Sequence, residues 1–407
     1  MARVEAHKQP TPATTPAGFG TLIIAAVLPL VLLAAVLGVF LLQGDALIGS
    51  ISNNAPPVEK LTVERIAFRE DEILVKVVNG GPAPVELATV FVDEAIWAFN
   101  LSPEGAIPRL GTAHVSIPYR WIEGEPHKIK LLSTTGIAFE KTADVALRSP
   151  SPSPAAFGAF AFIGLYAGVV PVYLGLLWFP LLRRIGRGAL RFLLAFTAGL
   201  LVFLGIDAIE ESLELAHTLG GAYHGTILVF LGVVIAFLAI AATSQWLSQG
   251  ERDTSRARLT LAYMVALGIG LHNFGEGLAI GAAFVLGEIA LGTFLIIGFM
   301  LHNTTEGLAI VAPVSKDRPA WHHFLLMGLL AGAPMILGAW FGGFTYSALW
   351  ATIFLAIGAG AIFQVVWEIG KMIVSEARER GLVNLASASG LVAGLLVMYA
   401  TALFIAK

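Results

Sequence analysis

The chain has 407 residues, of which 57% are hydrophobic and only 13% are charged, whereas about a quarter of the residues in soluble domains are charged. This shortage of charge predicts that much of the chain lies in lipid. The net charge of −3 gives no reason to expect nucleic acid as a partner, and the absence of cysteine excludes disulfides, thiolate metal sites and thiol nucleophiles.

The first apolar segment lies close to the N-terminus. Residues 20–43 form one uncharged stretch that is long enough to cross a membrane as a helix. A cleaved signal peptide has a shorter apolar region and a small-residue cleavage site, and this alternative stays open. We expect an uncleaved transmembrane anchor over residues 19–44, preceded by a cytoplasmic tail over residues 1–18.

Residues 55–148 have a different pattern, in which short runs of β-forming residues alternate with breaks of Gly, Pro and Asn. Runs such as EILVKVVN and VELATVFV are separated by turn segments such as NGGPAP and SPEGAIP. This pattern is typical of a small all-β sandwich of immunoglobulin-like type. The SPSPSP sequence that follows predicts a stiff linker over residues 149–155.

The remaining residues, 156–407, are almost entirely apolar and predict an all-α domain with eight further membrane-spanning helices. Cytoplasmic loops carry an excess of Lys and Arg. Nine spans with a cytoplasmic N-terminus place every basic connection in the cytoplasm, and they place the β-sandwich and the C-terminus outside the cell membrane. The eight spans lie near 156–182, 190–215, 224–248, 259–284, 288–313, 323–345, 348–371 and 383–405.

Several acidic residues fall inside these spans, whereas no Lys or Arg lies deep within one. Ionisable groups at membrane depth are costly and usually face a bundle interior or a water-filled path. They must be protonated, hydrated or neutralised by a cation, so the pattern favours a cation pathway. These acids are Asp207, Glu210, Glu211, Glu214, Glu276, Glu306 and Glu368.

The fourth and fifth of the eight spans contain a repeated motif. Residues 271–280 read LHNFGEGLAI and residues 301–310 read LHNTTEGLAI, so eight of ten positions match. In each copy His and Glu are four residues apart and share one helical face. Both histidines lie 15 residues from Gly287, near which the two helices connect, so an antiparallel pair places them at the same depth.

Two imidazoles and two carboxylates suit borderline divalent ions such as Zn²⁺, Fe²⁺ or Mn²⁺. We also expect Gly277 and Gly307 to let the two motif helices approach closely. The alternative is that the motif residues are polar packing groups hydrogen-bonded across the bundle. The expected metal ligands are His272, Asn273, Glu276, His302, Asn303 and Glu306.

These motifs resemble those of the ZIP (Zrt-, Irt-like) family of metal transporters. The fourth helix of that family typically carries His-Asn-x-x-Glu/Asp-Gly, matched here by residues 272–277, and the fifth carries a related motif, matched by residues 302–307. The resemblance covers roughly residues 156–407. It implies metal uptake toward the cytosol through a mid-membrane site, by elevator-like movement of one helix group against another.

The chain departs from the family in three respects, one of which is that the His-rich loop common after the third helix is absent, since residues 249–258 are short and Arg-rich. Ala333 precedes Pro334 where members often have a Glu that helps to form a second metal position. We therefore expect one principal ion, with Asn273 and Asn303 in a weaker or transient second position. The anchor and the β-sandwich are not part of the usual family core, and the sandwich is a candidate for dimerisation or for binding a partner.

Other polar residues are candidates for a pathway to and from the centre. Glu210, Glu211 and Glu214 follow Asp207 at helical spacing, which indicates either an acidic stripe that attracts cations or a partly hydrated helix end. Gln364 and Glu368 are four residues apart on the seventh helix and are candidates for an exit path.

We therefore expect transport of divalent transition-metal ions, Zn²⁺ before Fe²⁺, Mn²⁺ or Cd²⁺, with no enzyme activity and no separate cofactor. Metal ions and membrane lipids are the expected partners. One alternative is an intramembrane metal-dependent hydrolase, since His and Glu also activate water, although the His-Glu-x-x-His signature is absent. Another is a receptor that acts through the β-sandwich, for which buried acids would be unnecessary.

Overall fold

The computed structural model describes residues 27–28, 30–39, 58–248, 254–377 and 385–405. The chain divides into two compact units, Met1–Pro57 and Val58–Lys407, and each is described by itself. In the first unit a short apolar helix spans Leu30–Val39. The expected cytoplasmic tail and most of the expected anchor lie outside the described residues.

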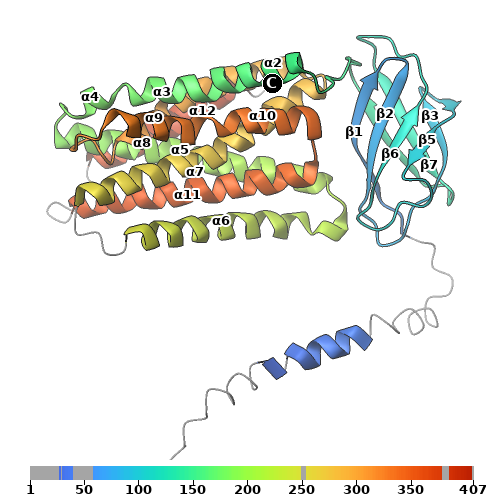
Figure 1. Ribbon diagram of the computed structural model, residues 1–407, viewed down its shortest axis with the longest axis horizontal. Helices are drawn as coiled ribbons and strands as arrows, with labels where there is room; N and C mark the ends of the chain where they lie inside the picture. The colour runs from blue at the N-terminus through green and yellow to red at the C-terminus, as the bar shows by residue number, and fades with distance from the viewer. Residues whose placement is uncertain (1–26, 29, 40–57, 249–253, 378–384, 406–407) are drawn as a thin grey trace, which may run out of the picture. The chain divides into compact units, whose positions relative to one another are not determined.

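The second unit begins with eight antiparallel strands that form two four-stranded sheets, which together we call the β-region (Figure 1). The strand orders are β1-β2-β6-β5 and β4-β3-β7-β8. Side chains from both sheets, including Ile73, Val90 and Val115, share one core, because alternate residues of each strand point to the same face. The strands are β1 Leu61–Arg69, β2 Glu72–Asn79, β3 Leu87–Val92, β4 Ala95–Trp97, β5 Asn100–Ser102, β6 Thr112–Ile117, β7 His127–Ser133 and β8 Ala138–Ala143.

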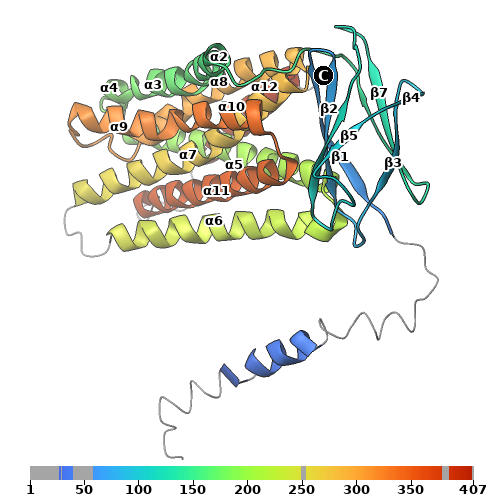
Figure 2. The same cartoon turned by 45° about the vertical axis from the view of Figure 1, so that its right-hand side comes forward.

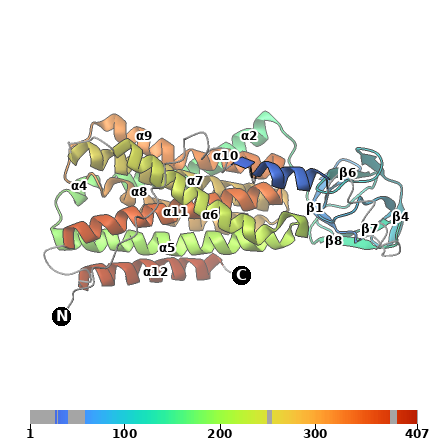
Figure 3. The same ribbon diagram turned by 90° about the horizontal axis from the view of Figure 1, so that it is seen from below.

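The rest of the unit is a bundle of helices whose axes run side by side (Figure 2). Seen from below, α5 lies between α11 and α12 (Figure 3), and α5 packs along both of them. The helices are α2 Pro154–Gly164, α3 Val170–Leu176, α4 Phe179–Leu182, α5 Arg187–Thr218, α6 Gly225–Ser248, α7 Thr254–Val285, α8 Ile289–Val311, α9 Trp321–Gly332, α10 Pro334–Thr345, α11 Ala348–Ala377 and α12 Leu385–Ile405.

Among the described residues, seven helical segments are long and apolar enough to cross a membrane, which confirms the expected polytopic membrane protein. The helix α7 is not among the seven, since His272, Asn273 and Glu276 lower its hydropathy. The seven segments are Pro154–Leu182, Gly188–Thr218, Gly221–Trp246, Ile289–Val311, Trp321–Thr345, Ala348–Val374 and Leu385–Leu403.

Two of these segments are interrupted near their middle. A π-helical turn, η1 Leu165–Val169, separates α2 from α3. The junction of Ala333 and Pro334 separates α9 from α10, because proline cannot donate a helical hydrogen bond. Both interrupted segments pack against the motif helices, since α10 and α9 lie along α7 while α3 and η1 lie along α8. π-Helical turns such as η1 are frequent at functional sites.

The β-region is docked on the helices by polar contacts. Glu64 Oε1 accepts a hydrogen bond from the Ala348 N–H at 2.6 Å, so a carboxylate of β1 caps the N-terminus of α11. Glu64 also pairs with Lys76 at 2.7 Å, and Lys76 donates to the Tyr346 carbonyl at 3.3 Å. These contacts fix the β-region beside the loop between α10 and α11.

Candidate metal centre

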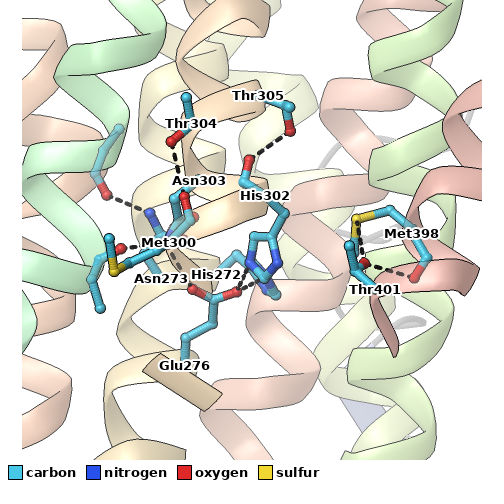
Figure 4. A network of polar contacts seen from close by, with 12 residues as sticks. His272, Asn273, Glu276, Met300, His302, Asn303, Thr304, Thr305, Met398 and Thr401 are labelled. Carbon is cyan, nitrogen blue, oxygen red and sulfur yellow. Dashed lines mark hydrogen bonds and ion pairs between the residues drawn. The ribbon is translucent and has the colours of Figure 1, made fainter. Parts of the chain in front are cut away.

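The two copies of the motif lie on α7 and α8, and their side chains meet inside the bundle (Figure 4). Glu276 Oε1 lies 2.5 Å from His302 Nε2 and 3.0 Å from His272 Nε2. The three residues are at most 6% exposed. One ligand atom from each lies within 4.8 Å of the others, which is a spacing at which a single metal ion can bind all three.

The motif asparagines are held by the two interrupted segments. Asn303 Nδ2 donates to the Ala167 carbonyl in η1 at 3.0 Å and to Glu276 Oε2 at 3.2 Å. Asn273 Nδ2 donates to the Ala331 carbonyl near the end of α9 at 3.1 Å. Because all three partners are acceptors, the amide nitrogens must face them, and this leaves each Oδ1 atom without a hydrogen-bond donor.

Glu306 lies outside the three-atom group. Its side chain is 1% exposed and lies near the amide of Asn273, but neither carboxylate oxygen makes a hydrogen bond of ordinary geometry. Buried polar atoms nearly always have hydrogen-bond partners. Within the described part of the chain, the centre therefore holds more acceptor oxygens than donors, which is the arrangement that a bound cation would satisfy.

A cavity of about 60 Å³ adjoins the three clustered side chains, with room for a few water molecules. Its lining includes His272, Glu276 and His302, together with Asp207 and Glu211 from α5. Part of α12 forms the opposite wall. Two acids of the expected pathway therefore face the space beside the candidate ligands.

The other expected pathway residues do not line this cavity. Glu210 and Glu214 are exposed. Gln364 is fully buried and donates to Glu368 Oε1 at 3.1 Å, while Lys371 Nζ lies 2.7 Å from the same oxygen. Glu368 therefore has a cationic partner in this structure, because Lys371 lies one turn further along α11.

The motif glycines make close contacts, although not with each other. A Cβ atom on Gly277 would lie 2.2 Å from the Met335 carbonyl oxygen on α10, and one on Gly307 would lie 2.3 Å from the Val172 carbonyl oxygen on α3. The prediction that these glycines let α7 and α8 approach one another is wrong. Each glycine instead brings its motif helix against an interrupted segment.

This packing predicts that Gly307→Ala lowers the free energy of unfolding by about 1–3 kcal/mol, as overpacking does in other cores. Gly158→Ala on α2 is the matched control, because a Cβ there meets no atom within 4 Å. The control should be neutral or stabilising, since alanine favours helix by about 1 kcal/mol over glycine. Thermal unfolding of the detergent-solubilised chain measures both, and equal midpoints would contradict the close contact.

Sequence reasoning missed the carbonyl groups that position the asparagines. Pro334, three residues after Ala331, is a visible signal for the interruption between α9 and α10. The segment around Ala167 reads LYAGV and contains no residue that specifies a π-helical turn. The visible signal lies just beyond this segment, because Pro171, four residues after Ala167, has no N–H to donate to the Ala167 carbonyl and leaves that carbonyl free for Asn303.

A search against models of known protein families finds no match to this chain. The interpretation of the candidate centre therefore depends on the contacts and burial of its residues described above.

Proposed function

We propose that this protein transports divalent transition-metal ions across the cell membrane, with Zn²⁺ as the foremost substrate. The observation that carries the proposal is the buried group of His272, Glu276 and His302, surrounded by acceptor oxygens that lack donors. Imidazole nitrogens and carboxylate oxygens are ligands that Zn²⁺ takes in fourfold coordination. Glu306 is the proposed fourth ligand, and Asn273 and Asn303 form a weaker second position.

The proposal includes α7 as the eighth spanning helix of a ZIP-like unit. Its polar motif residues are buried inside the bundle rather than exposed on its surface, so they do not oppose its insertion. The alternation of basic connections supports a cytoplasmic N-terminus, preceding the anchor, and an extracytoplasmic β-region. The two four-stranded antiparallel sheets around one core support the immunoglobulin-like type of that region. With this orientation, transport is uptake toward the cytoplasm.

Cavities and acids support an entry route on the side of the β-region. The cavity at the centre shares Glu211 with a second cavity of about 190 Å³, which Glu288 and Tyr346 also line. Burial and the carboxylates of Glu64, Glu211 and Glu288 raise the pKa of Tyr346 to about 12. A cation that enters here meets a negative potential before it reaches the histidines.

Backbone contacts support movement of one helix group against another. The motif helices pack tightly against the interrupted segments at Gly277 and Gly307. A separate set of close contacts joins α5 to α12, where a Cβ on Gly394 would lie 2.1 Å from the Phe196 carbonyl oxygen. The helix α11 packs along α5 and so belongs with this second group. Gly358 of α11 faces the backbone of His272, so the centre lies where the two groups meet.

Uptake of radioactive zinc by proteoliposomes tests the function. Wild type should show saturable uptake, and His272→Ala/His302→Ala should lower the uptake rate by at least about 100-fold. Substitution of residues that only support a metal ligand already lowers metal affinity or activity by about 10–100-fold. Mn²⁺, Fe²⁺ and Cd²⁺ are the competitors that rank the substrates. His322→Ala/His323→Ala removes a histidine pair outside the centre and should transport normally. A folded wild type that moves none of these ions would overturn the proposal.

A further inference from the structure

A different cavity, of about 540 Å³, lies where the β-region meets the end of α10 and the segment before α2. We call it the basic cavity, because cationic side chains predominate in its lining and Glu70 is the one acid among the lining residues. Residues 149–152 and 344–346 complete the wall. The basic residues are Arg65, Arg69, Lys76, His114 and Arg148.

The positive charge of the basic cavity is only partly compensated. Arg148 pairs with Glu70 at 3.2 Å, and Lys76 pairs with a glutamate of β1 at 2.7 Å. Within the described residues, Arg65 and Arg69 have no carboxylate partner. Arg65 Nε is buried without a hydrogen-bond acceptor, and its Nη1 reaches only the Phe344 carbonyl at 3.4 Å. A buried donor without an acceptor is costly.

The electrostatic consequences appear on two side chains of the cavity. Burial and the charge of Arg69 lower the pKa of Arg65. Burial and the charges of Lys76 and Arg69 lower the pKa of His114, against the opposing effect of Glu64. Like charges therefore face one another across a space large enough for a ligand, and an anion there would relieve the repulsion and supply the missing acceptor.

The basic cavity borders apolar rings on the spanning helices. The ring of Phe344 lies 4.4 Å from that of Phe157 and 5.3 Å from that of Phe160, centroid to centroid. Trp340 Nε1 donates to the Phe157 carbonyl at 2.9 Å, and Phe157 is 41% exposed in the first turn of α2. Aromatic residues at the end of a spanning segment are typical of a membrane–water interface.

We propose that the basic cavity binds the phosphate group of an anionic phospholipid, with its acyl chains over Phe157 and Phe344. The guanidinium groups of Arg65 and Arg69 donate to the phosphate oxygens, for which their planar geometry is suited. The cavity volume lies within the range of small-molecule sites, roughly 300–1,000 Å³. The site shares no residue with the metal centre, so lipid binding at this site can be tested independently of metal transport.

Binding to the delipidated full chain in detergent tests this site. Short-chain phosphatidylglycerol should bind one molecule per chain by native mass spectrometry and titration calorimetry. Phosphatidylcholine, whose choline cancels the phosphate charge, should bind at least about tenfold more weakly, as should inorganic phosphate, which lacks acyl chains. Inorganic phosphate that binds as tightly as phosphatidylglycerol would overturn the lipid assignment in favour of free phosphate.

Arg65→Gln/Arg69→Gln should weaken phosphatidylglycerol binding by at least about tenfold, because two charge-assisted hydrogen bonds are lost. Arg109→Gln/Arg120→Gln makes the same change of charge at two exposed positions outside the cavity and should bind as wild type does. Without lipid, the first variant should unfold no earlier than wild type, since it removes repulsion, and this separates lost binding from misfolding. Equal affinities of the two double variants would overturn the proposal.

Discussion

Glu276→Gln is expected to stop metal transport and to destabilise the metal-free protein. Its carboxylate contacts three buried side chains: Oε1 lies 3.0 Å from His272 Nε2 and 2.5 Å from His302 Nε2, and Oε2 accepts from Asn303. An amide offers one acceptor oxygen and no charge, so at least one of these groups loses its partner. Breaking a buried charged network by removing one member typically costs about 3–5 kcal/mol.

Two measurements check this expectation. Zinc uptake by proteoliposomes should fall by at least about 100-fold, because loss of a direct ligand lowers activity at least as much as loss of a group that supports a ligand. Thermal unfolding with a chelator present should show a lower midpoint than wild type. Glu104→Gln is the control, because Glu104 is an exposed acid of the β-region. Uptake at the wild-type rate would exclude Glu276 as a ligand.

Periodicity and composition are enough to predict much of the architecture. The apolar runs mark the helices within a few residues, as α8 shows with Ile289–Val311 against an expected span of 288–313. Period-two alternation marks strands such as β2. The docking of the β-region could not be predicted in this way. Glu64 caps a helix that begins 284 residues later, and a contact at that separation leaves no local pattern.

The candidate centre shows the same division between local and tertiary information. His272 and Glu276 share a helical face by spacing alone, and the repeat indicates that His302 belongs with them. Spacing does not fix the rotation of α8 against α7, which leaves Glu306 outside the cluster in this structure. Spacing also gives no sign that the long side chain of Lys371 turns back along α11 to pair with Glu368.

Glu306→Gln is expected to have the opposite effect on stability from Glu276→Gln. Neither Glu306 oxygen has a hydrogen-bond donor of ordinary geometry, so the substitution removes an uncompensated buried group and not a network member. The Oδ1 atom of Asn273 also lacks a donor, and the new amide group can supply one. We expect the metal-free protein to gain about 1–3 kcal/mol of unfolding free energy, the usual cost of an unsatisfied buried polar group.

The response of the Glu306→Gln variant to zinc tests whether this unpartnered carboxylate is a metal ligand. If Glu306 completes the coordination, the variant loses uptake, and its midpoint rises less on addition of zinc than that of wild type, because a ligand stabilises only the state that binds it. Thermal unfolding with chelator measures the expected gain in stability of the variant. Thermal unfolding with zinc, together with the uptake assay, measures the expected loss of zinc binding and transport. Normal uptake would show that Glu306 does not hold the ion, and a lower midpoint in chelator would show that its carboxylate supports the metal-free fold.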